Sequence, residues 1–172
     1  MKRHFDSLSR EMSQSRQMAH EICRQFSRSP SKGNLKRLKT LFAHCGESVF
    51  IEAGFYCDYG HFIEIGDRVF ININCTILDA GRVSIGHDTL IGPNVQILAV
   101  THDVDPEVRL KKGSYAQNVS IGNNVWLAAG VIISPGVTVG DNSVVGAGSV
   151  VTSDVEANSL YVGHPAVKVK TI

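Results

Sequence analysis

Apolar residues recur at every sixth position along most of the chain, and this spacing constrains the fold more than any other feature of the sequence. The step from Ile77 to Ile85 is eight residues, which indicates two inserted residues, and the step from Ile97 to Ile121 is twenty-four, which keeps the phase. A period of six fits neither an α-helix nor a simple alternating strand. It predicts a solenoid of short strands separated by tight corners. The twelve positions are Ile65, Ile71, Ile77, Ile85, Ile91, Ile97, Ile121, Leu127, Ile133, Val139, Val145 and Val151.

The residues around these positions support the same interpretation. A smaller residue stands two positions earlier and points to the same side, because strand side chains alternate. Stacked coils bury a shared interior column that no single coil can bury, and an ordinary β-sandwich is the less favoured alternative. Glycine, asparagine and aspartate tolerate the backbone angles of a sharp turn. Turn-forming pairs follow the apolar positions at Pro93–Asn94, Asn123–Asn124, Pro135–Gly136, Asp141–Asn142 and Ala147–Gly148.

The rest of the chain differs in kind from the repeats. Residues 5–45 are polar with scattered apolar positions and predict short helices, interrupted by the breaker "SRSPSKG". A charged segment, 101–118, interrupts the repeats as a loop-like insertion, and the rhythm fades after Asp154. We therefore divide the chain into an N-terminal helical segment (1–46), a solenoid domain (47–158) that carries the insertion, and a C-terminal tail (159–172).

Composition restricts the setting in which the chain works. The 172 residues carry a formal net charge of +1, which indicates no nucleic-acid partner. No apolar run approaches the length of a membrane span, and the N-terminus lacks the apolar centre of a secretory signal. The four cysteines show no paired metal-ligand spacing and predict free core thiols, which fits a cytoplasmic protein. They are Cys23, Cys45, Cys57 and Cys75.

The insertion begins with His102, at the point where the last regular coil can hold it. Loops on rigid scaffolds commonly carry function, and a histidine that titrates near neutral pH can act as a general base. The alternative is that His102 is a surface histidine in a loop that has no functional role.

Longer motifs resemble one family closely. "DYGHFIEIGDRVFININCTILD", "THDVDPEVR", "IGNNVWLAAGVIISPGVTVGDNSVVGAGSVVTSD" and "VGHPAVKV" are similar to the maltose and galactoside O-acetyltransferases, which include nodulation-type sugar acetyltransferases. These belong to the hexapeptide-repeat acyltransferase superfamily. The resemblance is strong over about 47–170 and implies a left-handed parallel β-helix with three hexads per coil. Twelve positions then make four coils, with a partial coil earlier around "VFIEAGFYC".

The resemblance also implies a reaction and an acceptor site. In this family the loop histidine, here His102, deprotonates an acceptor hydroxyl that attacks the thioester of acetyl-CoA, and no metal is required. Asn72 matches the asparagine assigned to the oxyanion and the acceptor. Asp58 matches a position that contacts sugar hydroxyls, and Asp6 is a looser match to an N-terminal acidic ligand. Trp126 is expected to point outward, against a neighbouring subunit or a bound ligand.

The matched acetyl-CoA positions lie in the late coils and the tail. Backbone groups of Ala129 and Ala147 match contacts to the pantetheine arm, and Thr152 and Ser153 match the next positions. Two basic residues meet the nucleotide phosphates in galactoside-type members, and here Lys168 and Lys170 are the available cations.

Three residues depart from the family pattern. Val167 replaces one of the phosphate-binding basic residues, and Ser114 replaces a glutamate of the insertion. Ala80 replaces an aspartate that serves the acceptor in galactoside-type members, so a galactoside acceptor does not follow from the resemblance.

The family habit implies a homo-oligomer, a trimer with active sites between subunits, and the N-terminal segment is expected to cap the acceptor side. Three alternatives stay open. The acceptor can be a streptogramin-type antibiotic or an amino sugar rather than a saccharide hydroxyl. The chain can be a non-catalytic assembly module, although both His102 and Asn72 are present. A zinc site built from His61, His87 and His102 is the least favoured alternative, because no second histidine stands four residues from His102.

Overall fold

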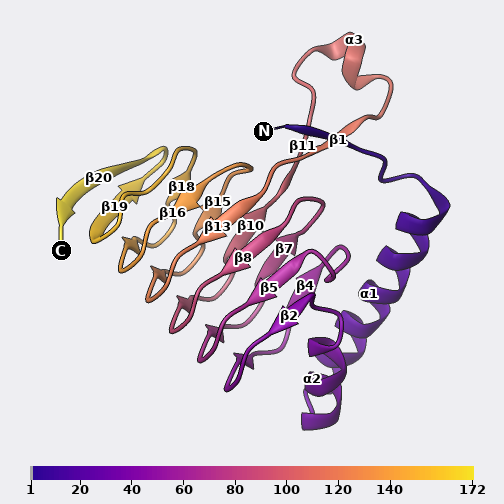
Figure 1. Cartoon of the computed structure of the whole chain (residues 1–172), viewed down its shortest axis with the longest axis horizontal. Helices are drawn as coiled ribbons and strands as arrows, with labels where there is room; N and C mark the ends of the chain where they lie inside the picture. The colour runs from indigo at the N-terminus through magenta and orange to yellow at the C-terminus, as the bar shows by residue number, and fades with distance from the viewer. Residues whose placement is uncertain (1) are drawn as a thin grey trace.

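The computed structural model describes residues 2–172, which wind into a parallel β-solenoid of about six turns with two helices beside its first coils (Figure 1). The chain passes repeatedly through three sheets in the same order, which we call sheets I, II and III. Successive coils pair in parallel and in register, as when Ile63–Ile65 pairs with Val83–Ile85. The predicted solenoid of hexapeptide repeats, with an N-terminal helical segment and one long insertion, is confirmed.

Each sheet collects one short strand from every coil. Sheet I contains β2 (His44–Cys45), β5 (Ile63–Ile65), β8 (Val83–Ile85), β13 (Val119–Ile121) and β16 (Thr138–Val139). Sheet II contains β3 (Phe50–Ile51), β6 (Phe70–Ile71), β9 (Leu90–Ile91), β14 (Trp126–Leu127), β17 (Val144–Val145), β19 (Ser159–Gly163) and β20 (Ala166–Thr171). Sheet III contains β4 (Tyr56–Cys57), β7 (Thr76–Leu78), β10 (Gln96–Leu98), β15 (Ile132–Ile133) and β18 (Val150–Val151). We name the corners between them the I/II, II/III and III/I edges.

The interior column consists of the residues that the spacing predicts. All twelve predicted positions are buried, and so are the smaller residues two positions before them. The column also extends beyond the prediction at both ends. A complete first coil replaces the expected partial one, because Cys45, Ile51 and Cys57 continue the six-residue interval with cysteine in place of isoleucine. After Asp154, Val155 still bridges to Val139 and is buried.

The corners adopt the conformation that their residues favour. In all five predicted turn pairs the second residue has a positive φ, from 51° at Asn124 to 88° at Gly136. At the I/II edge the asparagines form a ladder, because the Asn124 side-chain amide donates to Asn142 (3.0 Å) and Asn142 donates to Asn158 (2.9 Å). Side-chain bonds between coils therefore reinforce the backbone ladder.

Two helices close the N-terminal end of the column. α1 (Arg10–Arg28) begins at the N-cap Ser9 and α2 (Lys32–Lys39) at the N-cap Ser31, with Pro30 in the break between them. α1 is one long helix rather than the expected short ones, because its buried residues form a single face that joins the solenoid core. That face consists of Ala19, Ile22, Cys23 and Phe26.

The four cysteines are free, as predicted. Three of them are buried and Cys45 is half-buried. Across residues 2–172, no helix combines the length and apolar character needed to cross a bilayer.

Candidate active site

The insertion leaves and rejoins the solenoid at the III/I edge and forms a small sheet with the N-terminus. β11 (Val100–His102) and β12 (Ser114–Ala116) pair antiparallel, and β1 (Arg3–Phe5) adds to β12 as the third strand. The short helix α3 (Pro106–Arg109) connects β11 to β12 along the chain. Figure 1 shows this unit projecting from the solenoid with the N-terminal strand crossing its base. The strand at residues 3–5 has no apolar pattern, so the sequence did not predict it.

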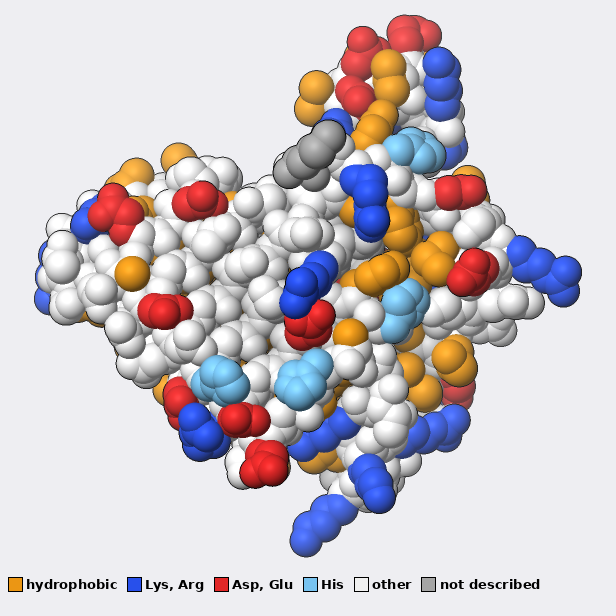
Figure 2. All heavy atoms as spheres, viewed as in Figure 1, with side chains coloured by type: hydrophobic (Ala, Val, Ile, Leu, Met, Phe, Trp, Pro, Cys, Tyr) orange, Lys and Arg blue, Asp and Glu red, His pale blue; other side chains and the backbone are white. Residues whose placement is uncertain are grey.

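A second small core fixes the base of the insertion. Phe5, Tyr59, Ala80 and Ala116 are buried together there. The ring of Phe5 packs edge-on against Tyr59, with centroids 5.5 Å apart. In Figure 2 apolar side chains gather in the region between the insertion and α1. His102 therefore extends from β11, which pairs with β12 along one edge and packs its Val100 against this small core.

His102 is oriented by the backbone of its own insertion. Its Nδ1 lies 3.0 Å from the carbonyl oxygen of Gly113. A carbonyl can only accept, so Nδ1 carries a proton, and in the neutral imidazole the lone pair is then on Nε2. The family pattern left open what orients His102 when Ser114 replaces a glutamate. The answer is the Gly113 carbonyl, while Ser114 is buried and lies 3.4 Å (Oγ to Oγ) from Ser7.

A cavity of about 290 Å³ lies beside His102. It brings together His102 and Asp58, two residues that the family resemblance assigns to the site, and it adds Arg16 from α1. Ser7 from the N-terminal segment and Ala80 from the III/I edge also line it. The cavity therefore combines an imidazole, a carboxylate and a guanidinium. No short-range pattern could have identified Arg16, because its helix is far from the insertion in sequence.

Asp58 is positioned by one direct contact and by the turn that follows it. Its Oδ1 lies 3.4 Å from His20 Nε2, and burial lowers the pKa of His20 although Asp58 opposes that shift. The turn that follows Asp58 is held by Asp79, whose two carboxylate oxygens accept the backbone N–H groups of Tyr59 (2.9 Å) and Gly60 (2.7 Å). Asp79 is fully buried and supports this turn.

Asp6 does not line the cavity, although its neighbours Phe5 and Ser7 do. Its Oδ1 accepts the backbone N–H of Leu8 at 3.1 Å. Asp6 is exposed and shapes the turn between β1 and α1.

Asn72 lies at a different edge from His102. It follows β6 at the II/III edge, whereas His102 belongs to the III/I edge, and the width of sheet III separates them. The Asn72 side-chain oxygen accepts the N–H of Ile73 at 2.8 Å, which leaves its two N–H donors available. Within one chain, no cavity described for residues 2–172 contains both Asn72 and His102.

Trp126 points outward from sheet II, as alternation predicts, with 51% of its surface exposed. The register stacks it in an outward-facing apolar row with the exposed Leu90 and Phe50 and the half-buried Phe70. The Phe50 and Phe70 rings stack with centroids 5.8 Å apart. The row lies on a face of the solenoid that does not carry the acceptor cavity.

The positions matched to acetyl-CoA fall into three groups. Ala129 and Ala147 are exposed at the II/III edge, on the same edge as Asn72. Thr152 and Ser153 are exposed at the III/I edge, after β18. The third group lies on β20, and consists of Lys168, Lys170 and the exposed Val167.

The two lysines of β20 differ in their surroundings. Lys168 Nζ lies 2.6 Å from Glu156 Oε2, and this contact raises the pKa of Lys168. Lys170 pairs through its backbone with Leu160. Lys170 is therefore the more available cation of the two.

A metal site does not form from the three histidines. His61 Nδ1 lies 3.3 Å from Ser15, and His87 Nδ1 accepts the N–H of Asp67 at the I/II edge. Among residues 2–172, no three histidine, cysteine or acidic side chains gather as a metal would require.

A solenoid of hexapeptide repeats with an oriented histidine at the root of its insertion defines the hexapeptide-repeat acyltransferase class. Comparison with known proteins supports this class. Residues 118–153 match the family model described as bacterial transferase hexapeptide (six repeats). The galactoside O-acetyltransferase of Lactococcus lactis is 38% identical over 86% of this chain and 72% of its own length.

Two solved structures are also similar over nearly the whole chain. A maltose O-acetyltransferase from Clostridium difficile has a TM-score of 0.95 and 35% identity, covering 98% of this chain and 92% of that one. A hexapeptide-repeat acetyltransferase from Vibrio cholerae, solved with acetyl-CoA, has a TM-score of 0.93 and 34% identity over the same shares. This chain belongs to the maltose and galactoside O-acetyltransferase family, a group of acetyl-CoA-dependent acetyltransferases.

Proposed function

We propose that the protein transfers the acetyl group of acetyl-CoA to a hydroxyl of a sugar or saccharide-like acceptor, with His102 as the general base. The observation that carries this proposal is the hydrogen bond from His102 Nδ1 to the Gly113 carbonyl, beside the cavity that contains Asp58 and Arg16. It leaves Nε2 as the acceptor of a hydroxyl proton. Asp58 and Arg16 supply the hydrogen-bonding groups that a polyhydroxylated acceptor needs.

The chemistry requires help because an alcohol ionises only far above neutral pH. His102 Nε2 takes the hydroxyl proton while the acceptor oxygen attacks the thioester carbonyl carbon. The carbonyl oxygen gains negative charge, and the free N–H donors of Asn72 are suited to stabilise it. When the C–S bond breaks, His102 returns its proton to the CoA thiolate. The products are the acetyl ester and CoA.

The II/III edge fits a narrow ligand arm lying against the backbone. A side chain added at Gly148 would meet no atom within 4 Å, and one added at Gly130 would meet only Gly148 atoms, at 4.0 Å. Ala129 and Ala147 stand beside these glycines and are exposed. Small residues thus leave an open lane on the two coils that carry Ala147 and Ala129, in the direction of Asn72. We assign this lane to the pantetheine arm, with Lys170 as the available cation for its phosphate end. Thr152 and Ser153 lie at the III/I edge with His102, so they reach the arm only across a subunit interface.

The positions of Asn72 and His102 favour an active site shared between subunits. The two residues lie at different edges, so His102 of one subunit meets Asn72 only across an interface. The outward-facing row of Phe50, Phe70, Leu90 and Trp126 provides an apolar face for such an interface. We propose a closed homo-trimer, in line with the family habit and with the preference of oligomers for cyclic symmetry.

The N-terminal segment contributes to the acceptor side in this proposal. Phe5, Ser7 and Arg16 all line the cavity beside His102. We infer that the N-terminal segment before β2 acts as a cap on the acceptor, and that the solenoid, which begins at β2, holds the reacting groups.

A panel of acceptors tests the proposed function. Acetyl-CoA is incubated with the protein and with neutral saccharides, acidic saccharides, amino sugars and a streptogramin-type antibiotic, and the release of free CoA thiol is measured. We expect turnover with saccharide hydroxyls and none with His102→Ala protein. Turnover restricted to the antibiotic or to an amine would contradict a saccharide hydroxyl acceptor, and no turnover with any acceptor would contradict catalysis.

A further inference from the structure

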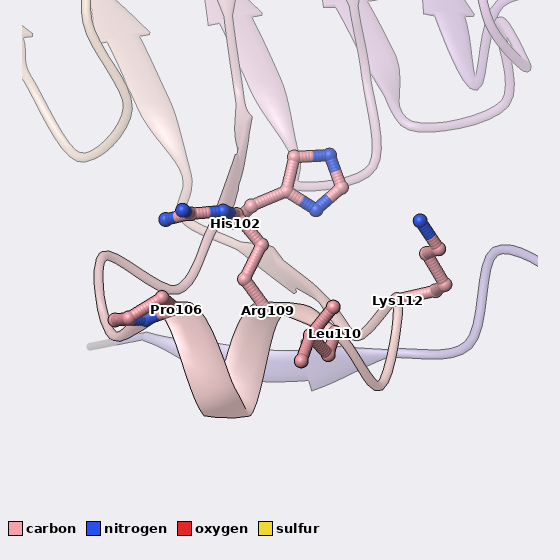
Figure 3. A pocket seen from close by; sticks show the side chains of 5 residues that line it. All are labelled: His102, Pro106, Arg109, Leu110 and Lys112. Carbon is pink, nitrogen blue, oxygen red and sulfur yellow. The ribbon is translucent and has the colours of Figure 1, made fainter.

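A second cavity meets His102 on the insertion side, and its lining differs from that of the acceptor cavity. It measures about 450 Å³ and is lined by His102, Pro106, Arg109, Leu110 and Lys112. In the view of Figure 3, the Arg109 guanidinium and the Lys112 ammonium lie on either side of the His102 imidazole. The lining therefore contains two cations and no carboxylate.

The charge of these cations is not neutralised by neighbouring side chains. Arg109 is held in place through Nη1, which donates to the backbone carbonyls of Asp103 (3.2 Å) and Val104 (3.1 Å). These carbonyls carry no net charge, and they leave the Nε and Nη2 donors for another partner. Within the described chain, neither Arg109 nor Lys112 forms an ion pair.

The acidic residues of the insertion are directed elsewhere. Asp103 lies 3.5 Å from Lys2 Nζ, and Asp105 accepts the first N–H groups of α3. Glu107 stands in the first turn of α3 and does not line the cavity. The cavity therefore presents a positive field next to the proposed base.

The phosphates of acetyl-CoA cannot fill this cavity during transfer. The thioester carbon must reach an acceptor oxygen that is itself within hydrogen-bonding distance of His102. The phosphates then lie the length of the pantetheine arm away from His102. An anion that occupies the cavity while acetyl transfer proceeds must accordingly belong to the acceptor.

We propose that the Arg109–Lys112 cavity binds an anionic group of the acceptor, so that the preferred acceptor is an acidic saccharide. This inference rests on the proposed acetyl transfer at His102. The anionic groups that fit this cavity are all oxyanions: the carboxylate of a uronic-type sugar, a sulfate ester or a phosphate ester. Arg109 supplies paired donors in a fixed plane and Lys112 supplies a point charge.

The test compares matched neutral and acidic oligosaccharides in which only the anionic group differs. Lys112→Asn removes one charge, and asparagine tolerates the positive φ of 59° at this position. The control is Lys111→Asn, since Lys111 is exposed and does not line the cavity. The preference is the ratio of kcat/KM for the acidic acceptor to that for its neutral counterpart.

We expect the preference to fall about tenfold in Lys112→Asn protein, as the loss of a hydrogen bond to a charged group implies, and to be retained in Lys111→Asn protein. Carboxylate, sulfate and phosphate members of the series distinguish the kind of anion. Equal preferences in the two variants, or a wild-type preference for the neutral acceptor, would overturn the anion site.

Calorimetric titration with the acidic oligosaccharide alone separates this inference from the proposed function. Binding that weakens in Lys112→Asn protein but not in the control supports the anion site even if no thiol is released. Acetylation of neutral saccharides without any such difference in binding leaves the proposed function standing and removes the anion site.

Discussion

His102 receives its orientation from a backbone carbonyl rather than from a carboxylate. The Gly113 carbonyl fixes the proton on Nδ1 without placing a negative charge next to the ring. The geometry depends on the register between β11 and β12, in which His102 faces Ser114. The tautomer of the proposed base is thus set by strand pairing.

Replacing His102 by alanine should lower kcat about 10²–10⁴-fold, because the acceptor hydroxyl loses its proton acceptor. The side chain is exposed, so thermal unfolding should change little. Thiol release and circular dichroism measure the two effects. His44→Ala, which removes an exposed histidine of sheet I, serves as the control. Activity within a few-fold of wild type would reject His102 as the base.

Replacing Asn72 by alanine should lower kcat about 10²–10³-fold while KM changes less, because an oxyanion donor acts as negative charge develops. Steady-state kinetics with a saturable acceptor separates the two constants. A raised KM with an unchanged kcat would reassign Asn72 to binding of the acceptor ground state.

At the scale of the element, the turn after β4 depends on one buried carboxylate. Burial raises the pKa of Asp79 to about 7, although its two backbone N–H partners oppose the shift. A folded-state pKa above the unfolded value means that the protonated group favours folding. This contribution is full below about pH 4 and is lost as the pH rises through about 7.

Asp79→Asn should therefore destabilise the protein more at pH 5 than at pH 8. An amide has one oxygen for two backbone donors, so one N–H loses its partner at a cost of about 1–3 kcal/mol. The loss of stability that wild type undergoes between the two pH values should be absent in the variant. Urea unfolding at both pH values measures the difference in unfolding free energy between wild type and variant. A difference that is larger at pH 8 than at pH 5 would contradict the raised pKa of Asp79.

The elements that the sequence predicts are those built on local regularity. The interior residues follow the six-residue interval, and the corner asparagines follow from turn chemistry, so both were predictable. The first coil was predicted only in part, around residues 49–57, because Cys45 occupies an isoleucine position at its start. The N-terminal strand at Arg3–Phe5 was missed because its stability comes from pairing with β12.

The residues of the candidate site likewise fall into those that a local motif identifies and those that only the tertiary structure brings to the site. His102 and Asp58 were identifiable through motifs, and the cavity joins them. Arg16, His20 and Lys112 were not, because their relevance depends on which distant segments fold together. The placement of Asn72 and His102 at different edges was not predicted either, because the edge at which a residue lies depends on how the hexads are distributed among the three sheets.

At the scale of the whole molecule, the distribution of residues over the edges predicts complementation between inactive variants. His102→Ala and Asn72→Ala proteins should each be nearly inactive, and a mixture refolded together should regain activity. Mixed trimers contain interfaces where both residues are intact. Light scattering verifies the assembly and thiol release measures the recovery. No recovery in verified mixed trimers would show that the two residues act within one subunit.

The insertion begins and ends at a single point of the scaffold. The carbonyl oxygen of Ala99 accepts both the N–H of Gly81 from the preceding coil and the N–H of Gln117 where the insertion returns, each at 3.1 Å. The coils on either side pair with each other directly, as β8 does with β13, so the stack is continuous beneath the insertion. Segments of other lengths and sequences can therefore be exchanged between Ala99 and Gln117 without altering a buried contact of the column. If the insertion selects the acceptor as proposed, acceptor preference can change by replacement of one surface segment, without a change in the proposed acetyl-donor lane.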